Sequence, residues 1–102
     1  MTKPQVTFRH MSSSQELQQI ATDAVVKLDK YCDNITNIDV IFTQDVACIV
    51  EIYLSVQGST LISKEQSEDF SKSLNSAIDK LIRQIRKQKT KDTKSKTTGL
   101  EY

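Results

Sequence analysis

The residues best suited to binding chemistry in this chain are the cations near its C-terminal end. From Asp79 to Lys96 the sequence DKLIRQIRKQKTKDTKSK carries eight basic side chains and two acids, although the net charge of the chain is only +1. Lysine and arginine pair with phosphate groups, so such a run favours a polyanionic partner. The dipole of a helix also attracts cations to its C-terminus, but that effect reaches only about one turn. Because the run continues past the predicted helix end, we expect a polyanion-binding segment.

Other kinds of chemistry have little support in the sequence. The single histidine, His10, has no second ligand at metal-binding spacing, and the serines at 12–14 are typical of a helix cap and turn. Two glycines provide no phosphate-cradling loop. Cys32 and Cys48 form no C-x-x-C motif and are typical of small buried hydrophobic residues in a reducing compartment, with a metal or redox role as the alternative. We therefore expect no enzyme, no metal and no cofactor.

The elements that must position the cations follow from hydrophobic periodicity. Alternating apolar residues predict strands, and apolar residues spaced by three and four predict amphipathic helices. Ser13 and Glu16 form a predicted capping box for the first helix, Ser67 a predicted cap for the second, and Gly58 a predicted hairpin turn. The predicted strands are 4–10, 38–43, 47–56 and 60–64, and the predicted helices are 13–33 and 67–90.

This order predicts an α+β fold with two layers, β-α-β-β-β-α, in which both helices pack on one face of a four-stranded sheet. We expect a single domain at 1–90 and a disordered basic C-terminal tail at 91–102. The other face of the sheet should expose Ile41, Ile49 and Tyr53, either as ordinary surface residues or as a self-association patch. One tyrosine beside Asp39 and Glu51 is not a base-stacking platform.

Length and hydropathy restrict the class of protein further. A chain of 102 residues with 37% hydrophobic content suits one small domain and leaves little room for a deep catalytic cleft. Its apolar runs are too short to cross a membrane, and MTKPQVTF does not have the apolar core of a signal peptide. We expect a cytoplasmic protein with no membrane partner and no small-molecule substrate.

Three stretches of the sequence resemble the bacterial ribosome hibernation promoting factors, also called ribosome-associated inhibitors or sigma-54 modulation proteins. EDFSKSLNSAIDKLIRQIRKQKTK (68–91) is similar to the last helix of that family, with its acidic pair, aromatic residue and A-I-x-x-L-x-x-Q-I core before the basic residues. FRHMSSSQEL with VVKLDKYCDNI, and EIYLSVQG, resemble the first strand and helix and the third strand. The connection TQDVAC is short, and ISKEQSED differs from the Gly-containing run of the family. With no separate dimerisation domain, the chain resembles a short-form member.

The resemblance implies a partner and a mode of action. Family members bind the small ribosomal subunit and the whole ribosome in the channel for mRNA and tRNA. They inhibit translation by steric occlusion and protect the idle ribosomes of stressed or stationary-phase bacteria. Carried over by position, the resemblance assigns rRNA contacts to Lys27, Lys30, Lys80, Arg83, Arg86, Lys87, Lys89 and Lys91. The free protein is expected to be monomeric. A general RNA-binding module and a protein-interaction domain that uses the open sheet face are the alternatives.

Overall fold

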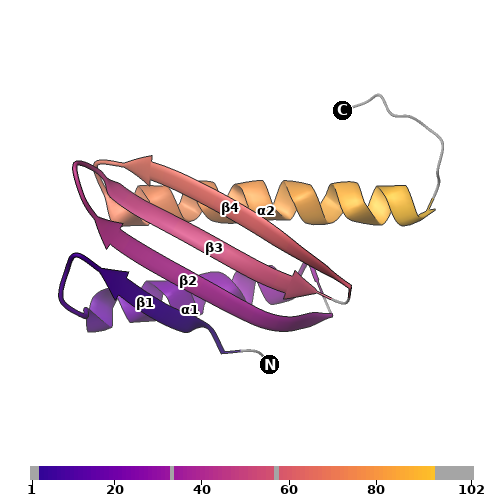
Figure 1. The fold of residues 1–102 in the computed structure, drawn as a ribbon. Helices are drawn as coiled ribbons and strands as arrows, with labels where there is room; N and C mark the ends of the chain where they lie inside the picture. The colour runs from indigo at the N-terminus through magenta and orange to yellow at the C-terminus, as the bar shows by residue number, and fades with distance from the viewer. Residues whose placement is uncertain (1–2, 33, 57, 94–102) are drawn as a thin grey trace.

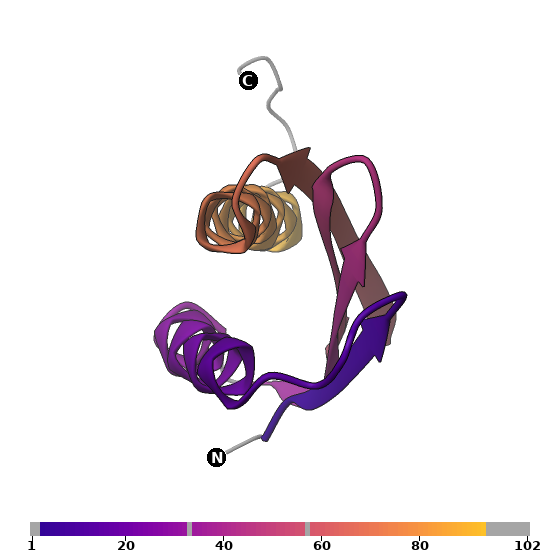
Figure 2. The same ribbon diagram turned by 90° about the vertical axis from the view of Figure 1, so that its left-hand side faces the viewer.

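The chain folds into one sheet and two helices in the predicted order. The computed structural model describes residues 3–32, 34–56 and 58–93, with backbone only from residue 88 onward. The sheet has the order β1-β2-β3-β4, with β1 parallel to β2 and the other neighbours antiparallel. Both helices cover the same face (Figures 1 and 2), which confirms the predicted two-layer α+β fold. The elements are β1 (Gln5–Arg9), α1 (Gln15–Asp29), β2 (Ile35–Gln44), β3 (Cys48–Val56), β4 (Ser59–Ser67) and α2 (Phe70–Thr93).

The core lies between the sheet and the helices, where the alternation of the strands predicts it. Successive rows across the sheet place Val6, Val40 and Ile52 together, then Phe8, Phe42 and Val50, all on the helix side. The fully buried side chains of β2 and β3 are Ile38, Val40, Phe42, Val50, Ile52 and Leu54, and those of the helices include Ala21, Leu28, Ala77 and Leu81.

Three aromatic rings tie the layers together at one end of the core. The ring of Phe42 stacks on that of Phe8 with centroids 5.6 Å apart, and meets the ring of Phe70 edge-on at 5.5 Å. Such pairs add about 0.5–1.5 kcal/mol to the burial of their area. Phe42 therefore links the edge strand β1 to the first turn of α2.

Polar contacts fasten α2 over β3 and β4. Ser63 is buried and donates from its hydroxyl to the Ala77 carbonyl at 3.0 Å, and the buried hydroxyl of Ser73 donates to the Cys48 carbonyl at 2.7 Å. The Gln84 amide donates to the Ile62 carbonyl at 3.0 Å. Buried polar groups need such partners, so these bonds restrict where α2 can lie on the sheet.

The element ends differ from the predictions by a few residues. Ser14, not Ser13, caps α1: its side chain accepts from the Leu17 N–H at 3.2 Å, so the predicted capping box with Glu16 is wrong. Ser67 is the last residue of β4 rather than the predicted cap of α2. The N–H of Ser71 instead donates to the Asp69 carboxylate at 3.4 Å.

Three further boundaries differ from the predictions, and three predicted features lie outside the described residues. α1 stops at Asp29, earlier than predicted, β4 spans Ser59–Ser67, and α2 continues to Thr93. Gly58 has the predicted positive φ, at 79°. The predicted turn at Asp33, Gln57 of the hairpin turn, and the tail from 94 to 102 lie outside the described residues.

The two helices run side by side in the same direction (Figure 1). Ile20 and Ala24 of α1 lie beside Leu74 and Asn75 of α2, while the ring of Tyr31, just after α1, lies beside Arg86. Each helix follows a strand and returns along the sheet, which explains the common direction. Both C-termini therefore lie at one end of the molecule.

Candidate nucleic-acid interface

Exposed cations lie at the C-terminal end of α1 and in the C-terminal half of the parallel helix α2. α1 provides Lys27 in its last turn and Lys30 at its C-cap. α2 provides Arg83, Arg86 and Lys87 in its C-terminal half, and all five are exposed. Lys27 and Lys30 are also favoured by the partial negative charge at the C-terminus of α1. We call this group the cationic end: Lys27, Lys30, Arg83, Arg86 and Lys87.

Acidic side chains gather toward the opposite end of the helix layer. Glu16 lies in the first turn of α1, and Glu68 and Asp69 directly precede α2. Glu68 forms an ion pair with Lys72, in the first turn of α2, at 3.2 Å. The charge of the helix layer is therefore polarised along the helices.

The cations of the cationic end differ in how they are held. Among the described residues, Lys27, Lys30 and Arg83 have no hydrogen-bonding or ionic partner. The Arg86 guanidinium carbon lies 5.7 Å from the ring centroid of Tyr31, a cation–π distance that orients its planar donors. A phosphate approaching Lys27, Lys30 or Arg83 therefore meets a charge that need not first leave another partner among the described residues.

The remaining predicted contacts lie apart from the cationic end. Lys80 occupies the flank of α2 that faces β4, where it forms an ion pair with Glu65. Its side chain is still 56% exposed, so it borders the interface without belonging to the cluster. Lys89 lies on α2 as predicted, and Lys91 lies on the continued helix rather than on the predicted tail, but the side chains of both lie outside the described part of the chain.

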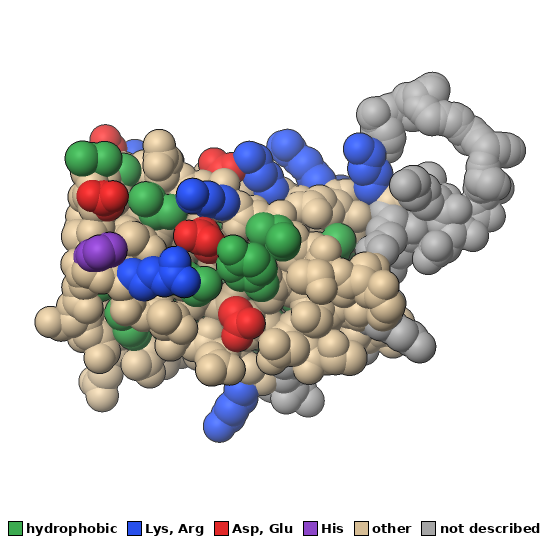
Figure 3. All heavy atoms as spheres, in the orientation of Figure 1, with side chains coloured by type: hydrophobic (Ala, Val, Ile, Leu, Met, Phe, Trp, Pro, Cys, Tyr) green, Lys and Arg blue, Asp and Glu red, His purple; other side chains and the backbone are tan. Residues whose placement is uncertain are grey.

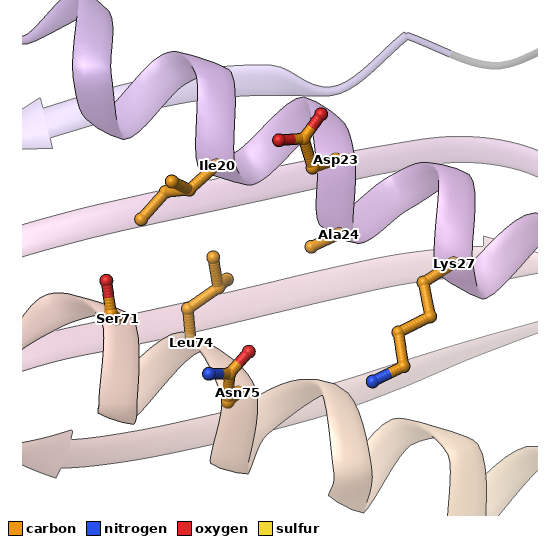
Figure 4. Close-up of a pocket in the computed structure, with 7 residues that line it drawn as sticks. All are labelled: Ile20, Asp23, Ala24, Lys27, Ser71, Leu74 and Asn75. Atoms are coloured by element: carbon orange, nitrogen blue, oxygen red, sulfur yellow. The ribbon is translucent and has the colours of Figure 1, made fainter.

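A groove between α1 and α2 borders the cationic end, and no pattern of residues predicted it. Its volume is about 280 Å³. Figure 4 shows Ile20 and Leu74 pointing toward each other across it, and Lys27 extending from α1 toward α2. Small polar residues on an exposed helix face have no distinctive pattern, which is why Ser71 and Asn75 were missed. We call this the inter-helix groove: Ile20, Asp23, Ala24, Lys27, Ser71, Leu74 and Asn75.

The open sheet face is the alternative surface. Figure 3 shows apolar side chains there among both acids and cations. Ile41, Ile49 and Tyr53 lie on this face but are half-buried rather than fully exposed, while Ile62 is 53% exposed. The Tyr53 hydroxyl donates to Glu51 at 3.0 Å, and this hydrogen bond with the nearby carboxylate charge raises the pKa of Tyr53. This mixed face offers less positive charge than the helix layer.

The described residues hold no cluster of three metal-ligating side chains. Cys32 and Cys48 are free, half-buried thiols, and Cys48 Sγ lies 4.0 Å from the Gln44 amide oxygen. Among the same residues, no helix combines the length and the apolar character that a membrane span requires. His10 has a left-handed backbone at φ 59° in an exposed turn.

The fold and this charge distribution define a small two-layer domain with a cationic helix end, and comparisons with known proteins place it in a family. The model of the family described as sigma 54 modulation protein / S30EA ribosomal protein matches residues 5–93. The chain belongs to this family.

Individual relatives agree with this family. A ribosome hibernation promoting factor of Pseudomonas putida is 26% identical over 87 residues, which are 84% of this chain and 85% of that protein. A ribosome hibernation promotion factor of Deinococcus radiodurans is 30% identical over 101 residues, 93% of this chain but only 53% of that protein.

Solved structures share the fold. A ribosomal subunit interface protein of Coxiella burnetii has a TM-score of 0.77 at 25% identity, over 85% of this chain and 97% of that one. The N-terminal domain of Protein Y from Thermus thermophilus also has a TM-score of 0.77, at 18% identity, over 86% of this chain and 99% of that one. The second likeness concerns the fold alone.

Proposed function

We propose that this protein binds the small ribosomal subunit through its cationic end, in the channel for mRNA and tRNA. It blocks translation there by occupying space, and it stabilises idle ribosomes in the cytoplasm without catalysis or a cofactor. The observation that carries the proposal is the placement of three exposed cations, Lys27 and Lys30 at the end of α1 and Arg83 in the C-terminal half of the parallel helix α2, none of which has a partner within the described residues. The names of its relatives point to the same partner.

The physical chemistry suits rRNA. Phosphate contacts from lysine and arginine fix position without reading sequence, so selectivity must come from shape. Because α2 is held on the sheet by buried hydrogen bonds from Ser63 and Ser73, its charges are already ordered before binding. Ordered charges lose less entropy on association than those of a flexible tail. Lys80, Lys89 and Lys91 extend the proposed contact beyond the cationic end, and a monomer suffices for occlusion.

The test is co-sedimentation with purified subunits and whole ribosomes, paired with cell-free translation. The variant Lys27→Glu/Arg83→Glu reverses two cations of the proposed interface. Its matched control, Lys64→Glu/Lys72→Glu, has the same net charge but changes the open sheet face and the acidic end of α2. We expect the wild type and the control to travel with the small subunit and inhibit translation, and the interface variant to do neither.

Two outcomes would contradict the proposal. Equal loss of binding in both double variants would show that net charge, not this surface, determines association. Equal competition by any duplex RNA would instead favour a general RNA-binding module.

A further inference from the structure

We propose that the inter-helix groove binds one unpaired nucleobase of the RNA whose phosphates contact the cationic end. This inference rests on the proposed function and adds a base-binding subsite to it. The groove and the cationic end share Lys27, so one RNA strand reaches both.

The dimensions and the floor of the groove suit a flat ring. Its volume of about 280 Å³ lies just below the range of roughly 300–1,000 Å³ typical of small-molecule pockets. Leu74 is only 3% exposed and forms the floor with the half-buried Ile20 and Ala24. Unpaired bases of RNA are recognised by hydrogen bonds at their edges, and their flat faces bury apolar surface.

The rim provides the polar groups that a base edge requires. Asn75 carries an amide that can donate and accept at once, and among the described residues that amide has no partner. Figure 4 shows it on the α2 side of the groove, facing α1. Asparagine can pair with a base edge through two hydrogen bonds.

Charge sets the orientation of the bound nucleotide. The Lys27 ammonium lies on the side toward the cationic end, whereas Asp23 lies one turn earlier and is held by the Gln19 amide at 3.1 Å. A phosphate is repelled by Asp23 and attracted by Lys27. The base therefore enters between the helices with its phosphate toward Lys27.

The first measurement is the affinity for small ribosomal subunits over a salt series. Asn75→Leu blocks the groove, Asn75→Ala removes the amide alone, and Ser76→Leu adds the same side chain at the neighbouring exposed position as a control. We expect both Asn75 variants to bind about ten- to hundredfold more weakly, as the loss of a bidentate amide–base pair predicts. Their salt dependence should stay unchanged because no phosphate contact is lost. Ser76→Leu should bind like wild type, and unfolding curves confirm that all three variants fold.

The second measurement separates the two hypotheses. A thiouridine-substituted single-stranded RNA is photo-cross-linked to the whole protein, and the attached residues are mapped by mass spectrometry. Cross-links at Ile20, Leu74 or Asn75, absent with the same RNA as a duplex, support the subsite. Cross-links confined to the cationic end, with Asn75 variants binding subunits normally, would overturn the subsite and leave the proposed function intact. No binding of wild type to subunits would remove the proposed function and the subsite with it.

Discussion

The salt dependence of subunit binding should report how many cations contact phosphate. Each phosphate contact on a single strand contributes about 0.7 to the negative slope of log affinity against log salt. The five residues of the cationic end therefore contribute about −3.5 to the slope, which alone is a loss of about a hundredfold between roughly 50 and 200 mM salt. Neutralising Lys27 and Arg83 to Gln should reduce this contribution to about −2 and its share of the loss to about twentyfold.

These two residues suit the experiment because neither has a partner within the described residues, so their loss removes no internal contact. The assay is the fluorescence anisotropy of labelled protein with purified small subunits, at fixed magnesium and increasing potassium chloride. Lys64→Gln/Lys72→Gln is the matched control and should keep the wild-type slope. A slope that the Lys27/Arg83 change leaves at its wild-type value would refute the assignment of this surface.

Other substitutions test the fold and one titration. Phe42→Ala should lower the free energy of unfolding by about 3–5 kcal/mol in denaturant titration, because the ring is fully buried between two others. Ser73→Ala should cost about 1–3 kcal/mol by leaving a β3 carbonyl unsatisfied, also measured in denaturant. Gly58→Ala should cost about 1 kcal/mol because φ is +79°, whereas Gly58→Asn should cost less; thermal melting would compare them. Glu51→Gln should bring the pKa of Tyr53 down toward its ordinary value of 10.0 in an ultraviolet titration. Because the pKa of Tyr53 is raised in the folded state, its hydrogen bond to Glu51 stabilises the fold at pH values below 10.0. This stabilisation is lost as the pH rises through the folded-state pKa of Tyr53.

Periodicity predicted the fold well because burial on one face sets the pattern of each element. The alternation of Ile38, Val40 and Phe42 could only place these residues in the core of a half-covered sheet. The predicted cap of α1, Ser13, is one residue away from the actual cap, Ser14, because the three successive serines at 12–14 are chemically equivalent cap candidates.

The site was predicted less completely than the fold. The basic residues of α2 were visible as a pattern, but their division between two flanks was not. Lys80 turns toward Glu65 because β4 is longer than predicted and places that carboxylate on the helix side. The inter-helix groove depends on how two distant segments pack, which no local pattern around Ser71 or Asn75 reveals.

The most direct test of the central claim is an electron cryomicroscopy structure of the protein bound to the small ribosomal subunit. We predict that Lys27, Lys30 and Arg83 lie against rRNA phosphates in the mRNA and tRNA channel, with the open sheet face turned away from the RNA. A complex in which Ile62 and Tyr53 of the sheet face contact the ribosome, while the cationic end faces solvent, would contradict the account.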